Sequence, residues 1–314
     1  MSQPSATEPE RAEEKAAKPL RIAVTGGSGR IGRHVVKLLV ARGHSVVNLD
    51  RIQPREPSAR LCFVDLRKRE QVQPLLEQVD AVCHLGEIPG MGGSRPPEEI
   101  YAHNTQAGSV VLQTAADLKL QRVIYTSTCQ VYGCFGDPLV PPLRVPFDET
   151  HPLQPQNAYA MSKVANEGYA RFLAQYRNTS IAIFRFPAVW DWDIKDINED
   201  HFWIWLRRAT GKVSDLSTYL HAADAARAFA LAVENPRPGC EAYHFTAKDI
   251  FSSVPLRERL EKHNPDYPAL PADWPAYASP LLCSKAKEHF GWEPAISILD
   301  AYRRKFGKER DFRF

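Results

Sequence analysis

A glycine-rich turn with glycines at positions 26, 29 and 32 constrains the fold of this chain more than any other feature. The turn follows an apolar run, 20–25, that predicts a strand, and opens an amphipathic stretch, 31–43, that predicts a helix. The first glycine lets the chain turn sharply, the second admits a pyrophosphate close to the backbone, and the third lets the helix pack against the sheet. Because the helix N-terminus offers free N–H groups to phosphates, the unit is predicted to bind a dinucleotide.

An acidic residue, Asp50, ends the next strand-like run, 45–50. A carboxylate at this place accepts hydrogen bonds from both ribose hydroxyls of NAD and repels the 2′-phosphate of NADP. The neighbouring Arg51 offers a guanidinium to such a phosphate, so NADP stays open as the less favoured cofactor. We therefore expect NAD.

Short apolar runs alternate with amphipathic stretches along the rest of the chain, which predicts an α/β protein with a Rossmann-type, doubly wound parallel sheet. Further strands are expected at 61–65, 80–85, 122–127 and 180–186, and further helices at about 97–118, 157–176 and 222–234. We expect a disordered tail over 1–19, an NAD-binding domain over 20–186 to which 215–247 returns, and a small, discontinuous C-terminal substrate lobe formed by 187–214 and 248–314.

Composition argues against several classes of protein. The 40 Lys and Arg residues are mixed with 37 Asp and Glu residues, so no basic stripe suggests nucleic-acid binding. No run approaches 18 apolar residues, so no membrane span is expected. The six cysteines are scattered and no secretory signal precedes them, which favours a cytoplasmic protein. The ten histidines lack ligand spacing, so we expect no metal.

Tyr159 and Lys163 stand four residues apart in a predicted helix and therefore lie on one face. A free tyrosine, with a pKa near ~10, is a poor base at neutral pH. A nearby ammonium and a positive nicotinamide ring both favour the phenolate. The pair can thus take a proton from a substrate hydroxyl while hydride leaves for the cofactor.

Taken together, the motifs resemble those of the extended short-chain dehydrogenases/reductases, in the NAD-dependent epimerase/dehydratase family. The resemblance covers about residues 20–305 and keeps the family's order. The motifs that carry it are TGGSGRIG (25–32), VDL (64–66), HLG (84–86), HNTQAG (103–108), YTSTCQVYG (125–133), YLHAADAARA (219–228) and FGWEP (290–294).

This resemblance implies roles for individual residues. Tyr159 matches the catalytic base, Lys163 its ribose-binding partner, Thr128 the hydroxyl that holds the reacting oxygen, and Asn104 the helix asparagine near the nicotinamide. The expected cofactor-binding positions are Gly26, Ser28, Gly29, Arg30, Ile31, Gly32, Asp50, Asp65, Leu66, Leu85, Gly86, Asn104, Tyr159, Lys163 and Phe186. In family members the helices equivalent to 97–118 and 157–176 pair across a dimer, so a homodimer is expected.

Departures from the family pattern restrict the reaction. Cys129 and Gln130 stand where sugar-nucleotide dehydratases carry an acid pair, so dehydration is disfavoured, and Cys129 is interpreted as a packed thiol. Ala188 replaces the asparagine that touches nucleotide sugars in many members. The glycine-rich segment and arginine that precede the H-V-D-D stretch are missing, which weakens the case for a nucleoside-diphosphate substrate.

The short loop, the HLG strand end and the FGWEP ending also resemble uronate dehydrogenases. In that case a cation, Arg185 or Arg95, would meet the substrate carboxylate. The segment 190–206, rich in Trp and Asp, is read as an acidic loop feeding an aromatic core helix, with a sugar-stacking platform as the alternative.

We therefore predict NAD-dependent oxidation at the hydroxyl of a small carbohydrate. An epimerase-like reaction on a sugar or nucleotide sugar is placed first. The alternative is a sugar or uronate dehydrogenase that releases NADH. A non-catalytic sensor or scaffold that keeps only the dinucleotide fold is the less favoured third possibility.

Overall fold

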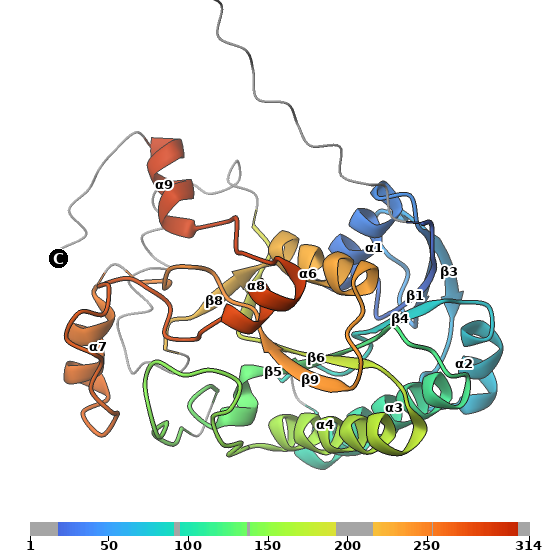
Figure 1. Ribbon diagram of the computed structural model, residues 1–314, viewed down its shortest axis with the longest axis horizontal. Coiled ribbons are helices and arrows are strands. Elements are labelled where there is room, and N and C mark those ends of the chain that lie inside the picture. Colours follow the sequence, from blue (N-terminus) through green and yellow to red (C-terminus); the bar gives the residue numbers. More distant parts are fainter. Residues whose placement is uncertain (1–17, 91–94, 137–138, 193–215, 253, 307–314) are drawn as a thin grey trace, which may run out of the picture.

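Seven parallel strands form one sheet in the order β3-β2-β1-β4-β5-β6-β9 (Figure 1). The strands are β1 (Arg21–Thr25), β2 (Ser45–Asp50), β3 (Arg60–Phe63), β4 (Ala81–His84), β5 (Val123–Thr128), β6 (Ile181–Phe186) and β9 (Cys240–His244). The strand order reverses between β1 and β4, and ligands of such sheets bind at the carboxyl ends of the strands beside this point. The predicted doubly wound α/β fold is confirmed.

The computed structural model describes residues 18–90, 95–136, 139–192, 216–252 and 254–306. The expected tail, 1–19, lies outside the described residues apart from its last two positions, and most of the expected lobe segment 187–214 lies outside them as well.

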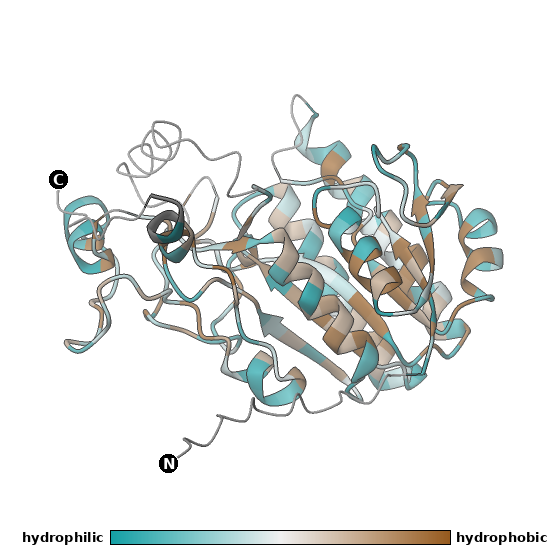
Figure 2. Cartoon of the chain, turned by 90° about the horizontal axis from the view of Figure 1, so that it is seen from above, coloured by the Kyte–Doolittle hydropathy of each residue, from teal (hydrophilic) through white to brown (hydrophobic). Residues whose placement is uncertain are grey.

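Helices cover both faces of the sheet (Figure 1). Helices α1 (Gly32–Ala41) and α6 (Ala222–Glu234) pack side by side on one face, and α2 (Arg69–Leu76), α3 (Pro97–Asp117) and α4 (Ala158–Arg177) lie on the other. Strands covered on both faces read as continuous apolar runs. Figure 2 shows this as hydrophobic colour concentrated in the strands between the helices.

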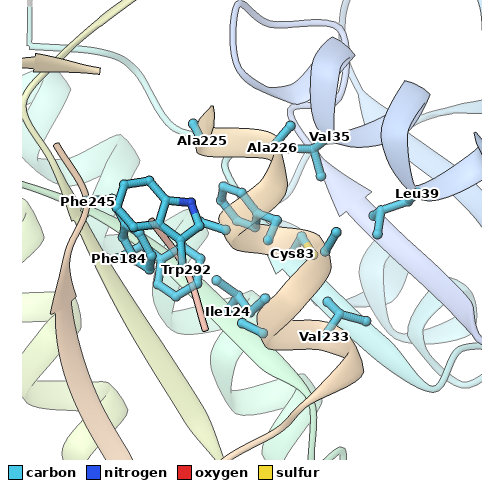
Figure 3. Packing of buried hydrophobic residues seen from close by; sticks show 14 of the residues in the cluster. Val35, Leu39, Cys83, Ile124, Phe184, Ala225, Ala226, Val233, Phe245 and Trp292 are labelled. Atoms are coloured by element: carbon cyan, nitrogen blue, oxygen red, sulfur yellow. The ribbon is translucent and has the colours of Figure 1, made fainter. Parts of the chain in front are cut away.

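The larger core lies between the sheet and the α1–α6 pair (Figure 3). Val35 and Leu39 project into this core from α1, and Phe184 lies beside the Trp292 indole in the same cluster. All four side chains are fully buried. Each contributes about 1.5–3 kcal/mol of transfer free energy relative to an exposed position. This packing fixes α1 and α6 on the sheet whose carboxyl ends form the site.

Shorter elements surround the carboxyl ends of the strands. They are the 3-10 turn η1 (Cys129–Tyr132), the two-stranded sheet β7 (Ala188–Trp190) and β8 (Tyr219–His221), and the helices α7 (Leu256–His263), α8 (Ser284–Phe290) and α9 (Ile298–Phe306). The Trp190 ring stacks on Phe251 with centroids 5.6 Å apart, and Trp192 meets His221 edge-on. These two indoles are packing residues, and the rest of the 190–206 segment lies outside the described residues.

None of the described helices is both long and apolar enough to cross a bilayer. Within the described ranges, no group of three or more His, Cys, Asp or Glu side chains is arranged to hold a metal ion.

Candidate active site

The glycine-rich turn joins β1 to α1 at the point where the strand order reverses. Gly26 has a φ of +69°, and a Cβ at this position would lie 2.8 Å from the Gly86 Cα at the end of β4. Only glycine fits this close approach of two strand ends. The N-cap of α1 is Ile31, whose side chain caps no N–H group. The turn thus presents backbone donors to an anion, as a pyrophosphate cradle requires.

Asp50 ends β2 beside this cradle. Its carboxylate accepts backbone N–H groups from Ser28 at 2.9 Å, Arg51 at 2.6 Å and Ile52 at 3.1 Å. The acid is therefore fixed where the adenosine ribose of a dinucleotide is expected. The Arg30 side chain donates to the Val189 carbonyl and ties the turn to β7.

Asp65 lies after β3, and both of its carboxylate oxygens accept from Arg67, at 2.9 and 2.6 Å. This pairing holds the pKa of the Asp65 carboxyl well below its usual range. The neighbouring Leu66 packs against Gly86, where an added Cβ would lie 2.3 Å from the leucine Cδ1. The VDL motif therefore reaches the same crevice as the cradle.

The Thr25 hydroxyl links the end of β1 to the residues that follow β4. The N–H groups of Leu85 and Gly86 both donate to Thr25 Oγ1, at 3.0 and 3.1 Å. Strand register places Thr25 beside His84, whose Nδ1 lies 2.7 Å from the same hydroxyl. The segment that follows β4 thus leaves the sheet in a fixed direction, over the crevice.

Tyr159 and Lys163 lie in the first turns of α4. The helix begins at this place because the Asn157 side chain accepts the Ala160 N–H at 2.8 Å. The Lys163 Nζ lies 5.5 Å from the centroid of the Tyr159 ring and donates to the Thr126 carbonyl of β5 at 2.7 Å. The predicted pair is therefore brought together beside the sheet, with its ammonium buried.

Glu87, directly after the HLG motif, also contacts this pair and was not predicted from the sequence. Its carboxylate forms an ion pair with Lys163 and accepts from Asn166 Nδ2 at 3.0 Å. Burial is the largest single influence and acts to raise the pKa of the Glu87 carboxyl, but Lys163 and His84 together outweigh it and the pKa is lowered. The sequence did contain a sign of this residue's role: Glu87 is a charged residue shortly after a strand-like apolar run, where charged side chains are rarely buried without a partner.

Thr128 and Asn104 are the other two predicted catalytic residues. The Thr128 hydroxyl, at the end of β5, accepts the Gln130 N–H at 3.3 Å and lies 3.5 Å from the Phe186 carbonyl. Asn104 is fully buried on α3 and hydrogen-bonds to the backbone of Ile88 rather than pointing into an open space. The Phe186 ring packs in the core, so only its backbone faces the site.

Comparison with known proteins agrees with this geometry. Residues 22–246 match the NAD dependent epimerase/dehydratase family. The chain belongs to this family. A UDP-glucose 4-epimerase of Lacticaseibacillus casei is 26% identical over 317 residues, which cover 90% of this chain and 94% of that protein.

Solved structures of the family share the fold. UDP-glucose 4-epimerase from Brucella ovis, in complex with NAD, matches with a TM-score of 0.67 and 23% identity over 90% of this chain and 95% of that one. A short-chain dehydrogenase/reductase superfamily protein from Agrobacterium tumefaciens, with bound NAD, matches with a TM-score of 0.68 and 18% identity over 92% and 99%. The match of residues 22–246 to the NAD dependent epimerase/dehydratase family identifies the chain as an NAD-dependent enzyme.

Family dehydratases carry acids where this family member has Cys129 and Gln130. Cys129 is buried, its thiol lies 3.5 Å from the Arg185 carbonyl, and burial raises its pKa well above the usual range. The Gln130 amide accepts from Asn157 Nδ2 at 3.2 Å. Gln130 therefore supports the start of α4, and the buried Cys129 thiol agrees with its interpretation as a packed thiol.

Arg185 does not provide a cation for a substrate carboxylate in this family member. Its guanidinium is 2% exposed, donates to Glu167 at 2.9 and 2.6 Å, and donates to the Tyr132 hydroxyl at 2.6 Å. The expectation that Arg185 meets a uronate is therefore wrong, because a buried partner already neutralises it. The other candidate, Arg95, is exposed and lies 4.0 Å from Glu99.

Proposed function

We propose that this enzyme epimerises a sugar nucleotide at one carbinol carbon and keeps its NAD during turnover. The observation that carries the proposal is the buried Lys163 ammonium 5.5 Å from the Tyr159 ring, beside a glycine cradle suited to a dinucleotide. The relatives that span the chain are UDP-glucose 4-epimerases, which supports a nucleotide-linked sugar.

The residues present fit the cofactor. Gly26 and Gly86 approach so closely that any Cβ would fill the cradle, and Asp50 stands at the end of β2. When bound, NAD supplies the hydride acceptor. Asp50 would hold the ribose hydroxyls, and Lys163 would hold the ribose next to the nicotinamide.

The protein's own residues would then carry the proton chemistry. Tyr159 takes the proton of the sugar hydroxyl, and the Thr128 hydroxyl holds the same oxygen. The positive charge of Lys163 favours the tyrosinate that this step needs. With the bound cofactor accepting and returning the hydride, Tyr159 would give the proton back to the same sugar oxygen, which would complete the epimer.

One observation favours a second function, net oxidation with release of NADH. Ala188, at the start of β7, is exposed, and its methyl group provides no hydrogen bond where many nucleotide-sugar members have an asparagine. This favours a smaller, free sugar or sugar acid. The loss of Arg185 as a carboxylate partner weakens the uronate form of this alternative.

The organisation of the molecule is also part of the proposal. We infer that 20–186 with 215–247 binds NAD and that 187–214 with 248–314 binds the sugar. We infer a cytoplasmic homodimer that pairs α3 and α4, because these helices expose Tyr101, Met161, Phe172 and Tyr176. The six cysteines are free thiols, as suits a reducing compartment.

The test is an incubation with NAD and separate UDP-hexoses, UDP-pentoses, free aldoses and uronic acids. Product chromatography and the absorbance of reduced cofactor are followed together. A new isomer without net NADH supports epimerisation. Net NADH with a free sugar or acid supports the dehydrogenase, and no conversion of any UDP-sugar contradicts the first proposal.

A further inference from the structure

Glu87 is a buried acid at the centre of the candidate site. Its side chain is 2% exposed, and the groups around its two oxygens come from three elements. They are Lys163 Nζ and Asn166 Nδ2 from α4, His84 Nε2 at 3.3 Å from β4, and the Tyr125 hydroxyl at 3.4 Å from β5. A buried carboxylate needs such partners, and the Lys163 ammonium forms an ion pair with it.

The tautomer of His84 follows from its hydrogen bonds. Thr25 Oγ1 already accepts two backbone N–H groups, so its own hydrogen points to His84 Nδ1 at 2.7 Å. Nδ1 is then the acceptor, and the ring hydrogen lies on Nε2, the nitrogen that faces Glu87. The Nε2–H of His84 then faces Glu87, and the ammonium that pairs with Glu87 is that of Lys163.

The same segment holds Tyr159 in place. A Cβ on Gly90 would lie 2.6 Å from Tyr159 Cδ1, so the backbone three residues after Glu87 packs directly on the phenol ring. One segment thus contacts both members of the pair: Gly90 packs on Tyr159, and Glu87 pairs with Lys163.

We propose that Glu87 is a positioning residue that sets the charge next to Tyr159 by pairing with Lys163. The carboxylate offsets part of the positive charge that the ammonium places beside the phenol, so Lys163 still favours the tyrosinate but less than an unpaired ammonium would. Tyr159 then keeps its proton to a higher pH than it would beside an unpaired lysine. The proposal rests on the proposed role of Tyr159 as the base.

The other titratable groups that face this cluster do not replace Glu87. Tyr125 on β5 is buried, and burial raises its pKa well above the ordinary value. Glu167 on α4 is held by Arg185 and Ser127. Burial acts to lower the pKa of Lys163, but Glu87 together with the other acidic groups nearby outweighs it and the pKa is raised. The ion pair thus stays charged at neutral pH.

The test uses the whole protein without substrate or cofactor, so it is independent of the proposed reaction. The near-ultraviolet absorbance of tyrosinate is titrated in the wild type and in Glu87→Gln, each against its own Tyr159→Phe partner. The difference isolates proton loss from Tyr159. The midpoint in Glu87→Gln is expected about one pH unit below the wild-type midpoint, because Lys163 then stands unpaired 5.5 Å from the Tyr159 ring.

Two variants provide controls. Glu87→Asp keeps the charge and is expected to return the midpoint towards that of the wild type. Glu234→Gln removes a buried carboxylate that pairs with Arg42 at the opposite end of the sheet, and its midpoint is expected to match the wild type. A Glu87→Gln midpoint equal to or above that of the wild type would overturn the proposal, as would a shift of equal size in Glu234→Gln.

Discussion

Asn104 and Ile88 are joined by two hydrogen bonds between α3 and the segment after β4. The Asn104 amide donates to the Ile88 carbonyl at 2.9 Å, and its oxygen accepts the Ile88 N–H at 2.8 Å. The segment from Glu87 to Gly90 contacts both Lys163 and Tyr159. Asn104 therefore shapes the candidate site through the backbone that it holds.

Replacing Asn104 with Ala should lower the free energy of unfolding by about 1–3 kcal/mol, because two backbone groups of Ile88 lose their buried partners. Urea denaturation measures the change. Ser109→Ala, on the same helix, removes only an exposed hydroxyl bonded to the Gln106 carbonyl and is the control. If Asn104→Ala is as stable as Ser109→Ala, the amide does not hold the segment.

Replacing Asp50 with Asn should weaken NAD binding about tenfold, because the ribose loses a charged acceptor. Binding of NADP should weaken less or improve, since the repulsion of its phosphate is removed while Arg51 remains. Isothermal titration with both cofactors gives the ratio. Asp80→Asn, at the opposite end of the sheet beside Arg21, should leave both affinities unchanged. An unchanged NAD affinity in Asp50→Asn argues against the ribose assignment.

The sequence predicted helices and strands well where turn and capping residues show where an element begins and ends. The predicted strand 45–50 and helix 222–234 coincide with β2 and α6. The helix α2, which was not predicted, contains Pro74 and buries only Val72 and Leu76, so its apolar period is short. Its formation depends on tertiary packing against α3.

The ion-pair partners of buried charged residues could not be predicted from the sequence. Arg185 was considered free to bind a substrate carboxylate because β6 contains no acidic residue that could pair with it. Its partner, Glu167, lies 18 residues earlier, on the helix α4. Glu87 was overlooked for the same reason. Whether a charge is free or paired depends on side-chain directions between elements, and hydrophobic periodicity does not report them.

His244 should make the protein less stable as the pH falls. Burial, with the charge of Arg185, lowers its pKa to about 3. Its Nδ1 donates to the Leu282 carbonyl, and its Nε2 accepts from Tyr132, so the folded protein holds the neutral ring. Below the ordinary histidine pKa of about 6.5 the unfolded chain binds a proton that the folded protein excludes. Stability is therefore present above that pH and is lost as the pH falls towards 3.

Urea denaturation of the wild type and His244→Gln tests this. Between about pH 7 and about pH 5 the wild type should lose about 2 kcal/mol more than the variant. His263→Gln, on α7, should follow the wild type. Equal losses in the wild type and His244→Gln would show that His244 does not contribute to the dependence.

The proposed dimer should dissociate when a charge is placed on α4. Phe172 is 48% exposed and its ring lies 5.1 Å from that of Tyr176, so the two form an apolar patch on the outer face. Phe172→Glu should be a monomer by light scattering, because burying an unpaired charge in the dimer interface is costly. Phe63→Glu, on the exposed edge strand β3, should remain a dimer. A wild-type monomer at the same concentration would rule the interface out.

The most direct test of the proposed chemistry is the rate of UDP-sugar epimerisation by Tyr159→Phe, measured with NAD saturating. The variant keeps the ring that packs on Gly90 and loses only the hydroxyl that takes the proton. Turnover is expected to fall about 10²–10⁴-fold. Turnover equal to that of the wild type would contradict the assignment of Tyr159 as the base.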